Sequence, residues 1–170
     1  MRVALSGAPL NRQQFSCSLI APFSRSKRHL WPRGQKFRAD EWITECDPTT
    51  RSGAPDCSIT VPFWQTSGDP RGSFALVVMF QTGNIGIVGQ PPPVRAVLRV
   101  DKNPPVECRQ PRYCVFPSVH ALSILRQLKV GSLILIDVDT EKGSFSFSLT
   151  AKGYQAGLAQ IHAWGYRTEE

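Results

Sequence analysis

Four of the five cysteines fall in two close pairs, and their chemistry is the most specific that the chain offers. The pairs are Cys46 with Cys57 and Cys108 with Cys114, whereas Cys17 stands alone near the N-terminus. Close cysteine pairs form disulfides in exported domains, and metal or redox sites in cytosolic ones. Neither pair has Cys-x-x-Cys spacing, and no histidine stands at zinc-ligand spacing from them. The sequence therefore favours two disulfides, Cys46–Cys57 and Cys108–Cys114, and an oxidising compartment.

Three alternating acidic residues offer a second kind of chemistry. Asp137, Asp139 and Glu141 are spaced like the first ligands of a calcium-binding loop. The sixth position of such a loop needs glycine, but here it is Lys142, whose positive charge would oppose the ion. We therefore interpret the segment as a solvated hairpin turn and expect no metal or cofactor.

Histidines and aromatic residues do not form a catalytic pattern in the sequence. His120 and His162 each lie in or beside an expected helix, without a partner four residues on. We interpret both as helix-surface or core residues. Trp42, Phe63 and Trp64 are more typical of core or loop packing than of a recognition surface. With no catalytic constellation visible, we expect a protein that is not an enzyme.

Arginines provide the one candidate binding patch. Two lie on one face of an expected strand and two near the second cysteine loop, and they are Arg95, Arg99, Arg109 and Arg112. Together they could attract an anionic ligand. Asp101 and Glu107 are close enough in sequence to neutralise them, which favours a solubilising role.

The net charge of the 170-residue chain is +7, and all of it arises near the N-terminus. Residues 1–40 hold eight Lys and Arg against one acid, whereas residues 41–170 hold twelve of each sign. A nucleic-acid-binding domain is expected to carry its own basic face, so we expect no nucleic-acid partner for residues 41–166. Binding of nucleic acid through the basic leader stays an alternative.

Residues 1–40 differ in composition from the rest of the chain. They are rich in Arg, Ser and Pro, contain no apolar run long enough to span a membrane, and show no clear signal peptide. We expect a disordered leader or a start site placed upstream of the true one. Residues 41–166 then form a single domain, and residues 167–170 a short tail.

Hydrophobic periodicity predicts a mainly β domain with two short helices in its C-terminal half. The expected strands cover residues 58–63, 73–81, 83–88, 94–101, 132–138 and 144–150, and the helices residues 118–130 and 153–164. The run 73–81 is apolar at both alternating sets of positions, which predicts a central strand covered on both faces. In the first helix Val119, Leu122, Leu125 and Leu128 form the expected apolar stripe, which Ala121 and Ile124 widen, and Ser118 is the expected N-cap. The fold class is an antiparallel sandwich or barrel stapled by disulfides.

Several motifs in this order resemble the invasion-associated locus B family of bacterial proteins. They run from Trp42-x-x-x-Cys46, Cys57-Ser-Ile and Leu98-Arg-Val-Asp to Cys108…Cys114, Leu125-x-x-Leu128-Lys-x-Gly131, Phe147-Ser-Leu-Thr and Gly153-Tyr-Gln-Ala-Gly-Leu158. The resemblance covers about residues 41–162. It departs from the family pattern at the leader, at Tyr113 and in the Gly-Gln-Pro-Pro-Pro loop.

The resemblance implies an exported, non-enzymatic, β-sandwich-like protein of the periplasm or outer membrane. In pathogens the family is associated with entry into host cells, including erythrocytes. We therefore expect a protein that binds another protein or an envelope component through its surface. A periplasmic enzyme of unrecognised type and a small-ligand-binding domain remain the alternatives.

Overall fold

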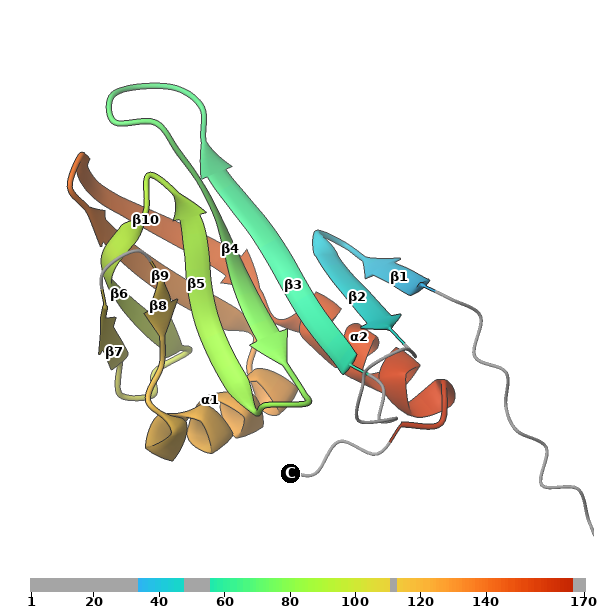
Figure 1. Ribbon diagram of the computed structural model, residues 1–170. Helices are drawn as coiled ribbons and strands as arrows, with labels where there is room; N and C mark the ends of the chain where they lie inside the picture. The colour runs from blue at the N-terminus through green and yellow to red at the C-terminus, as the bar shows by residue number, and fades with distance from the viewer. Residues whose placement is uncertain (1–33, 48–55, 111–112, 167–170) are drawn as a thin grey trace, which may run out of the picture. The chain divides into compact units, whose positions relative to one another are not determined.

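Residues 34–47, 56–110 and 113–166, described by the computed structural model, form two antiparallel sheets and two helices (Figure 1). The first sheet has the order β1-β2-β3-β4-β5-β8 and the second the order β10-β9-β6-β7. The strands are β1 (Gln35–Ala39), β2 (Trp42–Asp47), β3 (Asp56–Gln65), β4 (Gly72–Met79), β5 (Asn84–Gln90), β6 (Pro93–Val100), β7 (Val106–Arg109), β8 (Cys114–Val115), β9 (Leu133–Thr140) and β10 (Gly143–Thr150). The helices are α1 (Ser118–Val130) and α2 (Lys152–Ala163). The predicted class, mainly antiparallel β with two helices, is confirmed.

The core lies between the inner faces of the two sheets. Alternate residues of β3 and β4, such as Ile59, Val61, Leu76 and Val78, are fully buried, as the period of two in a strand requires. One part of this core is a cluster of four phenylalanine rings, which come from β3, β4 and β10 and are Phe63, Phe74, Phe145 and Phe147. The two nearest ring centroids in the cluster, those of Phe63 and Phe147, are 4.6 Å apart. The cluster therefore fastens the two sheets together.

Helix α1 has the predicted bounds, and it buries four of the six residues of the predicted apolar stripe but leaves Val119 and Leu122 exposed. Ala121, Ile124, Leu125 and Leu128 are buried, whereas Val119 is 79% exposed. These four follow the i, i+3, i+4, i+7 spacing that keeps side chains on one helix face, whereas repeated steps of three drift around the helix. The N-cap is Pro117 rather than Ser118, without a side-chain capping bond.

The folded domain begins earlier than the sequence predicts. Residues 35–39, which we placed in the leader, form β1 and pair with β2 along its length. The strand is held by backbone hydrogen bonds to β2, and its residues show no apolar pattern from which it could be predicted. The rest of the predicted leader, including Cys17, and the tail residues 167–170 lie outside the described residues.

Both predicted disulfides are present, and each has a different structural role. Cys46 and Cys57 lie opposite one another on the neighbouring strands β2 and β3, with a Cα–Cα distance of 4.1 Å. Cys108 lies on β7 and Cys114 on β8, with a Cα–Cα distance of 5.6 Å. The second bridge therefore links the four-stranded sheet to the six-stranded sheet. All four cysteines are buried.

Helix α2 approaches the inner face of β2 closely because two glycines lie one turn apart at the contact. A Cβ built on Gly153 would lie 2.1 Å from Trp42 Cδ1, and one on Gly157 would lie 2.3 Å from Thr44 Oγ1. Distances this short leave no room for a methyl group. The helix therefore packs on the strand at a separation that only glycine allows.

Replacing Gly153 by alanine should destabilise the domain by about 2 kcal/mol, because the methyl group overpacks the contact with Trp42. Helix propensity alone would give the opposite sign, a gain of about 1 kcal/mol. Urea unfolding of Gly153→Ala measures the difference, and Ala159→Gly at an exposed position of α2 calibrates the propensity effect. A Gly153→Ala variant more stable than the wild type would contradict the close packing.

Candidate functional site

The outer face formed by β3, β4 and β5 differs sharply in charge from the outer face of the four-stranded sheet. Beyond Asp56, which begins β3, the outward residues of β3, β4 and β5 form a face without a charged side chain, and we call these twelve residues the neutral face. They are Ser58, Thr60, Pro62, Trp64, Ser73, Ala75, Val77, Met79, Asn84, Gly86, Val88 and Gln90. The strand register arranges them in four rows, one of which is Thr60–Val77–Gly86. In Figure 1 these three strands lie in front of β6, β9 and β10.

The neutral face is where the sequence prediction of a doubly covered strand is wrong. The inner residues of β4, including Leu76 and Val78, are buried, but Ala75, Val77 and Met79 remain partly exposed. A strand apolar on both faces usually has protein on both. β4 therefore has the apolar composition of a strand covered on both faces, but no described element covers its outer face.

One end of the neutral face is hollowed beside an exposed tryptophan. Trp64 is 56% exposed, while the adjacent Phe63 is 4% exposed. The hollow has a volume of about 620 Å³ and is lined by residues that include Trp64, Arg71 and Gln90. We interpreted Trp64 from the sequence as a packing residue, and its exposure contradicts this. A large aromatic ring beside a hollow is typical of a protein-binding surface.

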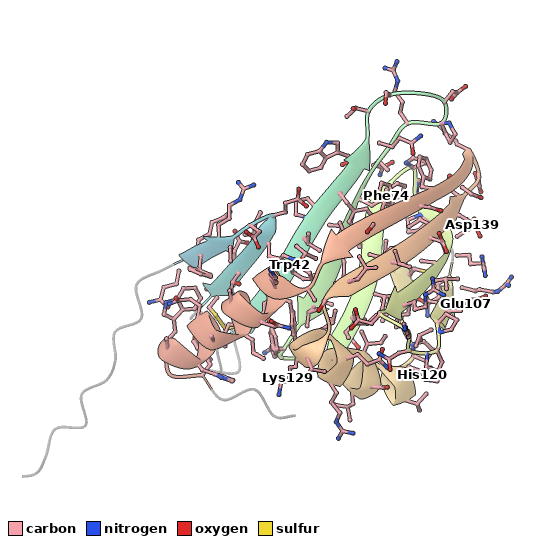
Figure 2. All side chains as sticks on the ribbon, turned by 180° about the vertical axis from the view of Figure 1, so that it is seen from behind. Trp42, Phe74, Glu107, His120, Lys129 and Asp139 are labelled. Carbon is pink, nitrogen blue, oxygen red and sulfur yellow. A yellow bond between two sulfur atoms is a disulfide. The ribbon has the colours of Figure 1, made fainter. Side chains whose placement is uncertain are left out.

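The outer face of the four-stranded sheet is, in contrast, charged and internally paired. Arg95 donates to Asp139 at 2.8 Å and to Glu107 at 3.1 Å. Arg109 donates in turn to Glu107, and Ser144 donates to Asp139 at 2.6 Å. This row crosses all four strands from β10 to β7, and Figure 2 shows Asp139 and Glu107 on this side of the molecule. We call these five residues the charged row.

Hydrogen bonding in the charged row shifts the pKa of both acids downwards. The hydroxyl of Ser144 and then the guanidinium of Arg95 lower the pKa of Asp139. Arg95 and then Arg109 lower the pKa of Glu107. Both acids thus raise the pKa of Arg95, and the row carries no excess of positive charge for an anion.

Acid should weaken the charged row. A carboxylate whose pKa is lower in the folded state stabilises the fold above its unfolded pKa, and this contribution disappears as the pH falls through the folded pKa. The unfolding free energy should therefore fall as the pH drops below about 4. Urea unfolding across this range should give a shallower pH slope for Asp139→Asn, and an intermediate slope for Ser144→Ala. Identical slopes in all three proteins would show that the row does not act through Asp139.

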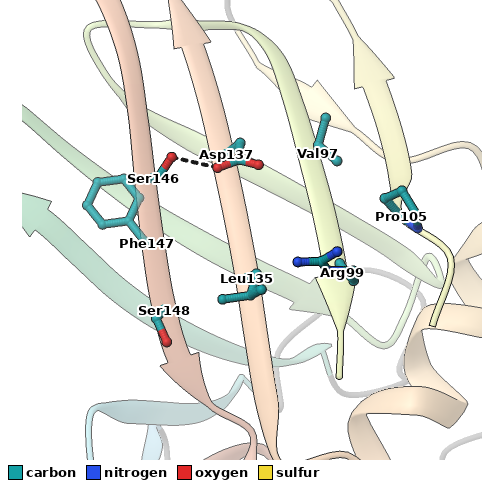
Figure 3. Close-up of a pocket in the computed structure, with 8 residues that line it drawn as sticks. All are labelled: Val97, Arg99, Pro105, Leu135, Asp137, Ser146, Phe147 and Ser148. Atoms are coloured by element: carbon teal, nitrogen blue, oxygen red, sulfur yellow. Dashed lines mark hydrogen bonds between the residues drawn. The ribbon is translucent and has the colours of Figure 1, made fainter. Parts of the chain in front are cut away.

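A second hollow lies beside the charged row, with a volume of about 450 Å³ (Figure 3). Its lining comes from β6, β9 and β10 and from Pro105, and comprises Val97, Arg99, Pro105, Leu135, Asp137, Ser146, Phe147 and Ser148. Ser146 donates to Asp137 at 2.6 Å. Arg99 makes no hydrogen bond or ion pair with the described residues, so its guanidinium can hold an anionic group. No histidine, cysteine or lysine lines this hollow.

The structure divides the predicted arginine patch. Arg95 and Arg109 are paired with acids, Arg99 lies apart in the hollow, and Arg112 is outside the described residues. Glu107 neutralises Arg95 as expected, but Asp101 does not. Its carboxylate instead accepts the backbone N–H groups of Ser132 and Leu133, because β6 ends one residue before it. The second acid that pairs with Arg95 is Asp139, and not Asp101 as the sequence suggested.

The remaining candidates do not converge on one place. Asp137 and Asp139 lie on β9 and Glu141 in the turn to β10, which confirms the predicted hairpin. His120 and His162 are exposed on α1 and α2, respectively, where helix residues were predicted. The sequence did contain the signal for the neutral face. Residues 58–92 hold only two charged side chains, Asp69 and Arg71, and both fall in the β3–β4 loop.

Within the described ranges, no helix is both long and apolar enough to cross a membrane. The same residues contain no group of three or more His, Cys, Asp or Glu that could hold a metal ion. Comparison of the chain with protein-family models, with curated proteins and with solved structures finds no match.

Proposed function

We propose that the chain is an exported, non-enzymatic envelope protein of the invasion-associated locus B type, located in the periplasm or at the outer membrane. It acts by binding a protein or an envelope component through its surface. The observation that carries this proposal is the pair of buried disulfides, because stable disulfides are characteristic of oxidising compartments. The two-sheet fold with its order of strands and helices supports the family resemblance.

The neutral face is the surface that we assign to this binding. Charged residues are depleted at the centres of protein–protein interfaces, and aromatic residues are enriched there. The neutral face has no charge, and Trp64 stands exposed at its end. The partner would therefore offer a flat, uncharged surface with a side chain that fills the hollow beside Trp64. If the source is a pathogen, the family resemblance implies that the partner can also be a component of the host-cell surface.

Fractionation of the cells that naturally produce the protein tests the proposed compartment. We expect the protein in the periplasmic or outer-membrane fraction, with Cys46–Cys57 and Cys108–Cys114 present in non-reduced peptide maps. Recovery in the cytoplasm with free thiols at these four positions would overturn the proposal.

Single substitutions test the surface. Val88 is 45% exposed on the neutral face, and Val94 is 36% exposed on the other sheet. Glutamate at position 88 would place a buried charge in the interface, so Val88→Glu should weaken binding to envelope or host-cell membranes more than about tenfold. Val94→Glu is the matched control and should bind like the wild type. Equal binding by both variants would exclude the neutral face.

A further inference from the structure

Strand β10 has an open edge that differs from every other sheet edge in the described part of the chain. The other three edge strands are short or charged. β1 contains Lys36 and Arg38, β7 has four residues that include Glu107 and Arg109, and β8 has two residues. Charges and short lengths at sheet edges discourage pairing with another chain. β10 has eight residues, Gly-Ser-Phe-Ser-Phe-Ser-Leu-Thr, with no charge and no proline.

The backbone groups on this edge can be assigned from the register. Thr140 and Gly143 flank the two-residue turn to β9 and close the hairpin as a hydrogen-bonded pair. Bonded and non-bonded pairs alternate in an antiparallel ladder. Ser144, Ser146 and Ser148 therefore occupy non-bonded pairs, and their N–H and C=O groups point away from β9.

Trp42 provides an independent check on this assignment. Its indole N–H donates to the carbonyl oxygen of Thr150 at 2.8 Å, so this carbonyl bonds a residue of β2 in the other sheet. Thr150 has the same parity in the strand as the three serines, so their carbonyl groups point to the same side. Trp42 occupies this edge at Thr150, whereas no other described residue bonds the backbone groups of Ser144, Ser146 and Ser148. The free edge thus runs from Ser144 to Ser148.

We propose that two copies of this chain associate by antiparallel pairing of their β10 strands, with Ser146 on the two-fold axis. This register pairs Ser144 of one copy with Ser148 of the other, and each pair of serines can exchange two backbone hydrogen bonds. Outward serines then face serines, while the inward Phe145 lies opposite Phe147 of the other copy. Because β10 carries no charge, its pairing with an identical strand opposes no like charges. This inference is independent of the proposed function.

A second copy is the occupant that the composition of β10 fits best. An antiparallel two-fold axis brings serine to serine and phenylalanine to phenylalanine along the whole free edge, so that the strand is complementary to itself. Phe147 is only partly buried within one copy and also lines the hollow of Figure 3. Pairing would cover the edge of this ring with the other copy's aromatic side chain, a favourable cross-strand contact.

Sedimentation equilibrium of the disulfide-bonded protein tests this pairing. The wild type should be a dimer at a protein concentration of about 100 µM. Ser146→Pro removes an edge N–H without removing a bond to β9, so its dimer dissociation constant should rise more than about tenfold. Ser146→Ala loses the same hydroxyl but keeps the N–H, and it should remain dimeric. A monomeric wild type, or equal dimerisation of Ser146→Pro, would overturn the proposal.

Cross-linking tests the register and does not depend on the proline variant folding. In a Cys17→Ser background, Ser146→Cys should form an intermolecular disulfide under mild oxidation, because the two positions meet at the two-fold axis. Ser144→Cys is the matched control, since Ser144 lies opposite Ser148 of the other copy and four residues away from its own equivalent. It should cross-link at least about tenfold more slowly, because strand positions four residues apart are separated by about 13 Å. Equal rates, or no cross-link from Ser146→Cys, would exclude this arrangement.

Discussion

Replacing Trp42 by alanine should lower the unfolding free energy of the domain by about 4 kcal/mol. Trp42 is 1% exposed and lies where β2, β10 and α2 meet. Its ring contacts Tyr154 edge to face at a centroid distance of 5.8 Å, and its N–H bonds the carbonyl oxygen of Thr150. Truncation to alanine removes both contacts and leaves a cavity beside Gly153. Thermal unfolding should show a Tm lower by more than about 10 °C.

Two further variants separate the contributions of the ring and its N–H group. Trp42→Phe keeps an aromatic ring but leaves the carbonyl of Thr150 without its donor, so the loss should be about 1–3 kcal/mol. Trp64→Ala is the matched control, because Trp64 is 56% exposed and should lose less than about 1 kcal/mol. Equal losses for Trp42→Ala and Trp64→Ala would show that the β2–α2 contact does not stabilise the domain.

Strand and helix positions could be predicted where one physical signal dominated. β10 alternates serine with large apolar residues, and its predicted range, 144–150, differs by one residue from the observed strand. Helix α1 has no competing turn signal between Ser118 and Gly131, and its bounds were predicted correctly. β1 was missed because Lys36 and Arg38 interrupt any apolar pattern, and its pairing with β2 depends on neighbours in space.

The candidate surfaces were harder to predict because exposure depends on tertiary packing. Periodicity places Leu76 and Val77 on opposite faces of β4, but it cannot tell which face another layer covers. The same limit applies to charge pairing. Arg95 and Asp139 are 44 residues apart in sequence, and only the β6–β9 register makes them neighbours. The scarcity of charged residues in segment 58–92 could be read from the sequence, but only the fold shows that it produces an uncharged outer face.

Reduction of both disulfides should remove about 5 kcal/mol from the unfolding free energy, a large part of the 5–15 kcal/mol typical of a domain. The chain-entropy estimate is about 3 kcal/mol for Cys46–Cys57, which spans 11 residues, and about 2 kcal/mol for Cys108–Cys114, which spans six. The two bridges join different pairs of strands, so their losses should add approximately. Urea unfolding of the double variants Cys46→Ala/Cys57→Ala and Cys108→Ala/Cys114→Ala measures each loss separately.

Cys17→Ala is the matched control for these variants, because it removes a cysteine and leaves both bridges in place. It should unfold at the wild-type urea concentration. The Cys108–Cys114 variant should also release β8 from β7, so amide exchange should accelerate at Ile87 and Val115 more than at Ile59. If the protein retains wild-type stability after full reduction, the bridges are dispensable for folding. An oxidising compartment would then no longer be needed to explain how this fold persists, and the proposed export would lose its physical basis.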